Sequence, residues 1–231
     1  MSEHSNIEWC DASWNPVTGC TPISHGCDHC YARTMTKRLC AAGVKKYADG
    51  FKVRMHEESL LEPMKWKKPK RVFVCSMGDL FHEDVTSGFI EKVLETAWKH
   101  APQHTYLFLT KRPERMAVEF TGRLPPNVWC GVTVEDAFAM TRIEHLRKVG
   151  ARVRFVSFEP LIGPLPELSL DGIDWAICGG ETGRGARTME AAWVRAIKAE
   201  SDRVRAKWFF KRWGDAVIDG DLRVMGREFP E

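Results

Sequence analysis

The sequence predicts an α/β protein in which parallel strands and outer helices form a partial or complete (β/α) TIM-like barrel. Short apolar, β-branched runs alternate with stretches whose apolar residues recur at helical spacing, as in βαβ units. The strand runs are apolar throughout, which is expected when both faces of a sheet are covered. The chain has 231 residues, about the length of a single barrel. We therefore expect one domain over residues 1–231.

The elements are expected in a regular order along the chain. An N-terminal strand is expected near Trp14, and a helix over about 30–42 follows it. The clearest strand is 71–75, and the helix after it, 87–100, has apolar residues at the spacing of one helix face. The later strands are expected at 105–109, 127–132, 153–157, 173–178 and 207–211, and the later helices at 113–119, 137–149 and 191–205. An open doubly wound sheet is the main alternative, but no G-x-G-x-x-G motif follows any strand.

The composition excludes several classes of protein. With 34 Lys and Arg against 31 Asp and Glu, the net charge is +3. This excludes a histone-like polycation and an acidic tail protein, but not a local basic patch. No run approaches the roughly 20 apolar residues of a membrane helix, and residues 1–6 lack the apolar core of a signal peptide. We therefore expect a cytoplasmic protein whose cysteines are thiols.

The eight cysteines are unevenly distributed, and five fall within the first 40 residues. Cys20, Cys27 and Cys30 form a C-x6-C-x2-C group. In a reducing compartment, such a group indicates a metal or cluster site rather than disulfides. The cysteines expected to be small buried hydrophobic residues, because each lies in or at the end of an apolar run, are Cys75, Cys130 and Cys178.

Two kinds of metal site suit this cysteine group. Three thiolates can hold three irons of a [4Fe–4S] cluster and leave the fourth iron open to a small molecule with adjacent amino and carboxylate groups. Zinc is the alternative, because Cys27 and Cys30 have the spacing of a zinc knuckle. Cys20 with Cys10, His25 or His29 would then complete four ligands. Spacing alone does not choose between the two.

Charged residues follow the expected strands at their carboxyl ends, where the functional groups of parallel α/β folds lie. Ordinary solvated loops and helix N-caps explain one or two such positions, but not five in succession. We therefore expect an active-site ring on one face of the barrel. Its members are Asp79, Lys111, Glu135, Glu159 and Glu181.

The cysteine group belongs to a longer motif that resembles a known superfamily. Asn15-Pro16, Gly19-Cys20, Cys27-x2-Cys30 and Tyr31-Ala32-Arg33 together resemble the radical S-adenosylmethionine (SAM) enzymes, in particular the spore photoproduct lyase-like branch. The chain departs from the usual pattern in two places: six residues separate the first two cysteines, and His29 precedes the third. The chain also resembles a phage-associated family, named after phage gene products thirty-seven and sixty-eight, over blocks 14–33, 72–81, 108–115, 128–135, 156–164, 175–187 and 208–214.

The resemblance implies cofactors and residue roles. It implies a [4Fe–4S] cluster on Cys20, Cys27 and Cys30 that cleaves SAM to a 5′-deoxyadenosyl radical, an external electron donor, and a lyase or oxidoreductase activity. The implied SAM-binding residues are Met77, Gly78 and Asp79 for the methionine amino group, Thr133 and Glu135 for the ribose and carboxylate, and Ser157 and Glu159 near the adenine. The candidate catalytic residues are Lys111, Glu159 and Glu181, and further candidate contacts to a carboxylate, phosphate or substrate are Arg112, Arg184 and Arg187.

A basic stretch and the cations Lys111, Arg112, Arg184 and Arg187 near the expected strand ends, together with the resemblance, favour a phosphate-bearing or nucleobase-containing substrate. Residues 65–71 contain five cations, and residues 208–214 mix aromatic and basic side chains. A solvated loop and a final barrel strand, respectively, are the alternative interpretations. We therefore expect a nucleic-acid or nucleotide substrate and no membrane partner. The alternative function is a zinc-stabilised nucleic-acid-binding or nuclease-type phage accessory protein on the same barrel.

Overall fold

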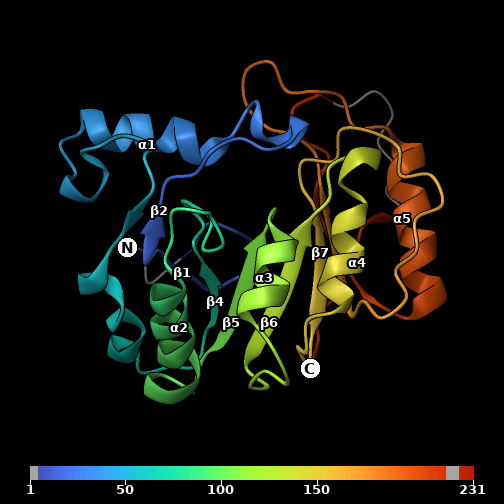
Figure 1. Cartoon of the computed structure of the whole chain (residues 1–231). Coiled ribbons are helices and arrows are strands. Elements are labelled where there is room, and N and C mark those ends of the chain that lie inside the picture. The colour runs from blue at the N-terminus through green and yellow to red at the C-terminus, as the bar shows by residue number, and fades with distance from the viewer. Residues whose placement is uncertain (1–4, 217–223) are drawn as a thin grey trace.

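The computed structural model describes residues 5–216 and 224–231. Within these residues, seven strands form one sheet in the order β1-β4-β5-β6-β7-β8-β9, and every neighbouring pair is parallel. The sheet curls into a half-barrel with helices around it (Figure 1). The strands are β1 (Ala12–Trp14), β4 (Arg71–Val74), β5 (Thr105–Thr110), β6 (Val128–Thr133), β7 (Arg154–Phe158), β8 (Trp175–Gly179) and β9 (Lys207–Arg212). Because β1 and β9 are the edges of this sheet, the predicted α/β barrel is a partial one.

The helices lie where the sequence predicted them, with one difference. They are α1 (Tyr31–Ala41), α2 (Ser87–Glu95) with a π-helical turn (Thr96–His100), α3 (Pro113–Glu119), α4 (Thr141–Arg147) and α5 (Ala191–Val204). The single helix expected over 137–149 is wrong, because a separate 3-10 turn, Ala137–Ala139, comes before α4. The carboxylate of Asp136 caps this turn by accepting a hydrogen bond from the backbone N–H of Phe138 at 3.0 Å.

Several short elements between β1 and β4 were not predicted. A small antiparallel sheet pairs β2 (Val17–Thr18) with β3 (Arg54–Met55). The 3-10 turns of this part of the chain are His25–Cys27, Lys45–Tyr47, Glu57–Ser59 and Glu62–Lys65. Elements of two to four residues are too short to show a hydrophobic period, so the sequence pattern does not reveal them.

Alternate residues of each strand enter two separate hydrophobic cores. On the outer face, side chains such as Val72, Phe108 and Val156 pack against the helices. On the inner face, β4 to β9 each contribute at least one large apolar residue: Phe73, Leu107, Trp129, Phe155, Trp175 and Phe209. Ile177 is a second such residue from β8. Burial of both faces explains why the strands are apolar throughout. No described helix is long and apolar enough to cross a membrane.

Aromatic side chains from the two ends of the described chain fill the inner side of the half-barrel. The ring of Trp9 lies 4.7 Å from that of Phe73 and meets Trp175 edge-on at 6.4 Å. The ring of Phe229 lies 5.6 Å from that of Trp175. Gly131 leaves room for this packing, because a Cβ there would lie 2.5 Å from the ring of Phe155. The inner core is therefore filled by aromatic packing rather than by further strands.

The prediction that Cys75, Cys130 and Cys178 are buried is confirmed. All three lie in the outer core. Burial raises the pKa of the Cys75 thiol to about 12, and it also raises the pKa values of Cys130 and Cys178. These thiols are therefore neutral packing groups at physiological pH.

Removal of one inner ring should destabilise the fold strongly. We expect Phe155→Ala to lower the free energy of unfolding by ~3–5 kcal/mol, because it leaves a cavity in a fully packed core. Urea unfolding followed by circular dichroism measures this change. Phe138→Ala removes an equally large ring that is 84% exposed, and this control should change stability by no more than ~0.5 kcal/mol. Equal losses for the two variants would contradict the packing described above.

Candidate active site

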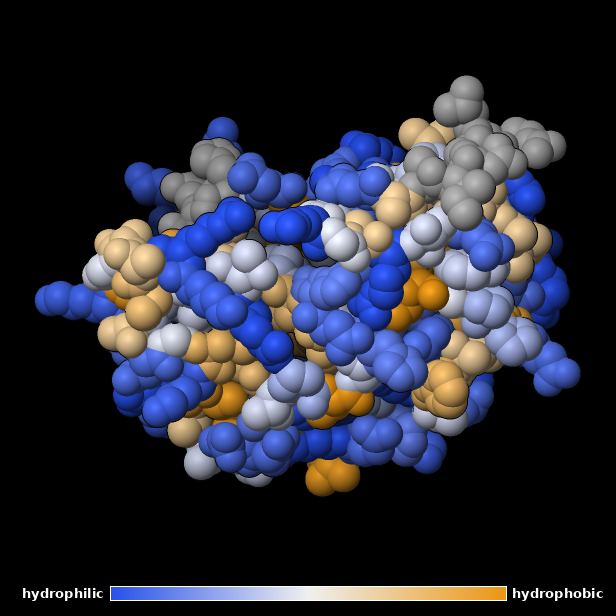
Figure 2. All heavy atoms as spheres, turned by 90° about the horizontal axis from the view of Figure 1, so that it is seen from above, coloured by the Kyte–Doolittle hydropathy of each residue, from blue (hydrophilic) through white to orange (hydrophobic). Residues whose placement is uncertain are grey.

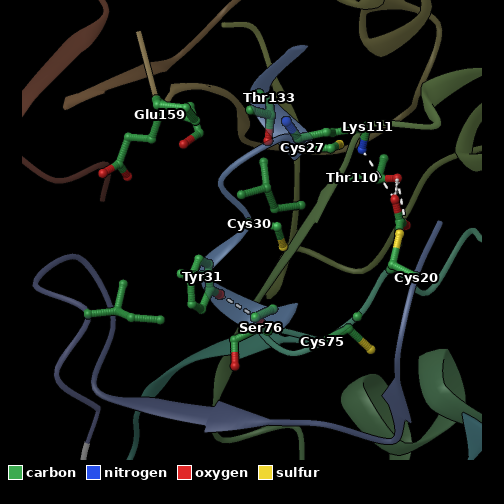
Figure 3. A pocket seen from close by; sticks show the side chains of 18 of the residues that line it. Cys20, Cys27, Cys30, Tyr31, Cys75, Ser76, Thr110, Lys111, Thr133 and Glu159 are labelled. Atoms are coloured by element: carbon green, nitrogen blue, oxygen red, sulfur yellow. Dashed lines mark hydrogen bonds between the residues drawn. The ribbon is translucent and has the colours of Figure 1, made fainter. Parts of the chain in front are cut away.

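A cavity of about 330 Å³ lies at the carboxyl ends of the strands. Most of the residues singled out from the sequence meet here (Figure 3). Those that line the cavity are Cys20, Cys27, Cys30, Gly78, Asp79, Lys111, Arg112, Thr133, Ser157, Glu159 and Glu181. Met77 and Glu135 do not line it: Met77 packs against Ala32 and Tyr47, and Glu135 is fully buried beside the cavity. The expected face thus contains a cavity, and the assigned residues outside its lining are Met77, Glu135, Arg184 and Arg187.

The three cysteines come from one loop, residues 20–30, which we call the cysteine loop. Cys20 follows β2, Cys27 ends the 3-10 turn His25–Cys27, and Cys30 directly precedes α1. Figure 3 shows the three around the same open space. In the part of the chain that the structure describes, no three His, Cys, Asp or Glu side chains form a ready-made metal group. The thiols share a cavity, but the cysteine loop would have to contract to bring them onto one metal centre.

The Asn-Pro…Gly-Cys part of the motif attaches the cysteine loop to the turn after β4. The side-chain oxygen of Asn15 accepts hydrogen bonds from the hydroxyl of Ser76 at 3.2 Å and from the backbone N–H of Met77 at 2.9 Å. The backbone N–H of Gly19 donates to the carbonyl of Met77 at 2.9 Å. Gly19 has a φ of +83°, and a Cβ there would lie 2.1 Å from the carbonyl oxygen of Lys52. Only glycine fits this position, and Met77 contributes through its backbone.

Asp79 holds the start of the cysteine loop indirectly. Its carboxylate accepts hydrogen bonds from the hydroxyl of Thr110 at 2.7 and 2.9 Å and pairs with Arg112 at 3.4 Å. Arg112 in turn donates to the sulfur of Cys20 at 3.3 Å. Burial raises the pKa of Cys20 to about 11, and the charge of Asp79 adds to this rise. The oxygens of Asp79 are already engaged, so we now place it as a positioning residue rather than as a direct contact to a methionine amino group.

Glu135 holds the middle of the cysteine loop. It accepts hydrogen bonds from Lys111 and from Arg142, both at 2.7 Å, and from the hydroxyl of Ser24. Burial alone would raise the pKa of Glu135, but the Lys111 and Arg142 cations lower it below its usual value. A fully buried carboxylate with three donors has no face left for the ribose or carboxylate of a ligand. In this structure Glu135 therefore positions Lys111 and the cysteine loop.

The tip of the cysteine loop approaches the end of β6 closely. His25 pairs with Asp136 at 2.7 Å. A Cβ on Gly26 would lie 2.8 Å from Nζ of Lys111, so a glycine is needed for this approach. Burial alone would raise the pKa of Cys27, but the Lys111 cation and neighbouring backbone N–H groups lower it. Cys27 therefore has more thiolate character than an ordinary cysteine.

Glu181, after β8, holds the end of the cysteine loop. Its carboxylate pairs with His29 at 2.9 Å and accepts a hydrogen bond from the side chain of Arg187 at 3.0 Å. Arg187 also donates to the carbonyl of His25 at 2.9 Å and pairs with Asp28 at 3.3 Å. Although burial opposes it, the hydrogen bonds from Arg187 and His29 lower the pKa of Glu181 to about 2. Glu181 lines the cavity as an anion that holds the cysteine loop.

Two hydroxyls and one carboxylate remain as polar groups on the far wall of the cavity. Thr133 and Ser157 are register partners on β6 and β7, so their side chains point the same way. Both line the cavity. Glu159 pairs with Lys211 at 2.8 Å and accepts a hydrogen bond from the indole of Trp9 at 3.1 Å. A Cβ on Gly179 would lie 2.8 Å from this carboxylate, so the glycine at the end of β8 makes room for it.

Other residues singled out from the sequence lie away from the cavity. Residues 65–71 lie before and at the amino end of β4, at the opposite end of that strand from the cavity. Arg184 is exposed and does not line the cavity. The aromatic residues Trp208, Phe209 and Phe210 are buried in β9, as the interpretation of a final barrel strand requires. The sequence did not indicate Ser24, Asp136 or Arg142: Ser24 and Asp136 each have a partner 111 residues away, and Arg142 reaches Glu135 from the following helix.

The Glu181 pair predicts a specific pH dependence. Because the pKa of Glu181 falls from 4.5 to about 2 on folding, its stabilisation is present above about pH 4.5 and is lost as the pH falls toward 2. We expect Glu181→Gln to lower the free energy of unfolding at neutral pH by ~2 kcal/mol and to flatten the loss of stability between pH ~4.5 and ~2. Urea unfolding at several pH values tests this. Glu91→Gln neutralises an exposed carboxylate on α2 and should behave like wild type; an unchanged pH profile in Glu181→Gln would contradict the assignment.

Comparison with known proteins places the chain in a family. Neither the search of curated proteins nor the search of solved structures found a match. A family model described as "Protein of unknown function (DUF5131)" matches residues 4–229. This match covers nearly the whole chain, including the cysteine loop and every residue that lines the cavity. The chain therefore belongs to the DUF5131 family of proteins of unknown function.

Proposed function

We propose that this protein is a radical SAM-type enzyme in which Cys20, Cys27 and Cys30 hold a [4Fe–4S] cluster. The observation that carries the proposal is that these three cysteines line the same cavity as the polar strand ends of a parallel half-barrel. Cys75 also borders the cavity, but its side chain belongs to the outer core. Three thiolates leave one iron of a cubane cluster without a protein ligand, and SAM would bind there.

The chemistry of the donor set fits such a cluster. The ligands of iron–sulfur clusters are thiolates, and Lys111 lowers the pKa of Cys27 toward the thiolate form. Arg112 donates a hydrogen bond to the sulfur of Cys20, and the hydroxyl of Ser24 lies 3.7 Å from the sulfur of Cys27. Hydrogen bonds to sulfur are one means by which proteins tune the potential of a cluster. Contraction of the cysteine loop would be needed to bring the three sulfurs together.

The remaining residues of the cavity would bind SAM and exclude water. The hydroxyls of Thr133 and Ser157 can hydrogen-bond the ribose or carboxylate, and Gly78 also lines the cavity. Glu159, held by Lys211, is placed to accept a hydrogen bond from an amino group of the ligand or substrate. When bound, the cluster would supply the electron for reductive cleavage of SAM, and an external donor would replace that electron. Trp9, Phe73 and Leu109 form apolar walls that keep water from the reacting atoms.

The zinc alternative makes different demands on the same residues. Cys10 is buried in the inner core, where its thiol donates a hydrogen bond to Ser5 at 3.3 Å. His25 and His29 are held by Asp136 and Glu181. Both pairs use Nδ1 of the histidine, and a carboxylate on one ring nitrogen is the usual partner of a metal-bound histidine, so Nε2 of His25 or His29 could be the fourth zinc ligand. If metal analysis of the purified protein finds zinc, that result would favour a nucleic-acid-binding or nuclease-type protein.

Metal analysis tests the proposed cluster directly. Anaerobically prepared protein should contain iron and acid-labile sulfide in a ratio near that of one [4Fe–4S] cluster, with broad visible absorption. Cys20→Ala, Cys27→Ala and Cys30→Ala should each abolish this absorption. Cys40→Ala is the matched control, because Cys40 lies in α1 but does not line the cavity, and Cys75→Ala is a second control. Stoichiometric zinc without sulfide would overturn the proposal.

Binding measurements test the assigned SAM contacts. We expect Thr133→Val to weaken SAM binding to the cluster-loaded protein about tenfold, because it removes a hydroxyl without changing the side-chain shape. Ser157→Ala should have a similar effect. Thr105→Val makes the same change at the amino end of β5 and should leave the Kd unchanged. Isothermal titration calorimetry gives the Kd, and an unaltered value in Thr133→Val would remove this residue from the site.

A further inference from the structure

The segment that covers one side of the cavity is strongly cationic. Residues 31–54 contain seven Lys and Arg but only one acidic residue, Asp49. The rest of the chain then has 27 Lys and Arg against 30 Asp and Glu, a net charge of −3. The overall charge of +3 therefore conceals a basic segment attached to a slightly acidic body.

Four cations of this segment are exposed and have no described ion-pair partner. They form what we call the α1 surface: Lys37, Arg38, Lys45 and Lys52. Elsewhere, many surface cations pair with nearby carboxylates, as Lys92 does with Glu57 at 2.9 Å and Lys198 with Asp202 at 2.6 Å. Unpaired cations gathered on one segment attract a polyanion more strongly than neutralised ones.

The α1 surface is continuous with the mouth of the cavity. Tyr31 and Ala32, at the start of α1, line the cavity, as does Phe51, next to Lys52. Figure 1 shows α1 above the carboxyl ends of the strands. Figure 2, which looks down on this face, shows strongly hydrophilic side chains with apolar ones between them. A polymer lying on this face would therefore pass directly over the cavity.

Two exposed aromatic rings flank the cysteine loop. Tyr31 as a residue is 56% exposed and lines the cavity, and its hydroxyl is fixed by a hydrogen bond to the carbonyl of Ser76. Phe138 is 84% exposed and meets the ring of His25 edge-on at 5.5 Å. Cations for the phosphates and aromatic rings for the bases are the combination by which proteins bind single-stranded nucleic acids.

We propose that the α1 surface binds the backbone of a single-stranded nucleic acid and leads one nucleotide into the cavity. As a statement about substrate class, this inference rests on the proposed function. It assigns phosphate contact to residues 31–54 instead of residues 65–71, which lie at the opposite end of β4 from the cavity. The exposed rings favour unpaired bases, because the faces of paired bases are already stacked in a duplex.

The binding test compares two variants that remove the same charge. Fluorescence anisotropy with labelled oligothymidine DNA and oligouridine RNA of about 20 nucleotides reports binding by the full chain. At low salt, K37Q/R38Q/K52Q should bind at least about tenfold more weakly than wild type, and its slope of log affinity against log salt should be smaller by about 2. K65Q/K67Q/K68Q is the matched control and should bind like wild type. The oligonucleotide that wild-type protein binds more tightly shows whether the α1 surface prefers DNA or RNA.

Several results would overturn the inference. The first is that wild-type protein binds neither oligonucleotide at low salt, and the second is that the control variant weakens binding as much as the α1-surface variant does. The third is that the protein binds phosphatidylserine vesicles but no oligonucleotide. Phe138→Ala should also weaken oligonucleotide binding, through lost stacking. Iron and sulfide content is measured on the same samples. Lost oligonucleotide binding with an intact cluster rejects only the substrate class, whereas bound oligonucleotide without a cluster rejects only the radical SAM proposal.

Discussion

The ionic attachment of the cysteine loop to the strand ends is the constraint on which the candidate site depends. Asp79, Glu135 and Glu181 follow three different strands, and each holds a different part of the loop, directly or through an arginine. Without these contacts, the three thiols of the loop would not fix it over the parallel sheet. Buried carboxylates are stable only when paired, and the cations that pair with these three belong to the half-barrel: Arg112, Lys111, Arg142 and Arg187.

The sequence was sufficient to predict the sheet, the helices and the face that carries the site. Periodicity reports burial of whole elements, and the strands from β4 to β9 are buried on both faces. It does not report which charged groups neutralise one another. Asp79 and Glu135 were therefore interpreted as ligand contacts, although their oxygens are engaged by Thr110, Lys111 and Arg142. In the sequence, Arg142 is indistinguishable from a solvated helix residue, because its partner becomes visible only in three dimensions.

The half-barrel also shows how a partial sheet can have a complete core. The inner face carries at least one large apolar side chain per strand from β4 to β9, and Trp9 and Phe229 cover these from outside the sheet. Trp9 also donates a hydrogen bond to Glu159, a residue of the cavity. The same indole thus belongs to the inner core and to the wall of the candidate site. A change in inner packing would be transmitted to the cavity through this residue.

The cysteine loop is made early in synthesis and fixed late in folding. Ser24 is separated from Glu135 by 111 residues, and His29 is separated from Glu181 by 152 residues. Contacts of such sequence separation form only after the intervening strands have assembled. On the ribosome, the first part of the chain emerges long before its carboxylate partners. Five of the eight cysteines lie within the first 40 residues, so a growing chain displays its thiols before the fold can protect them.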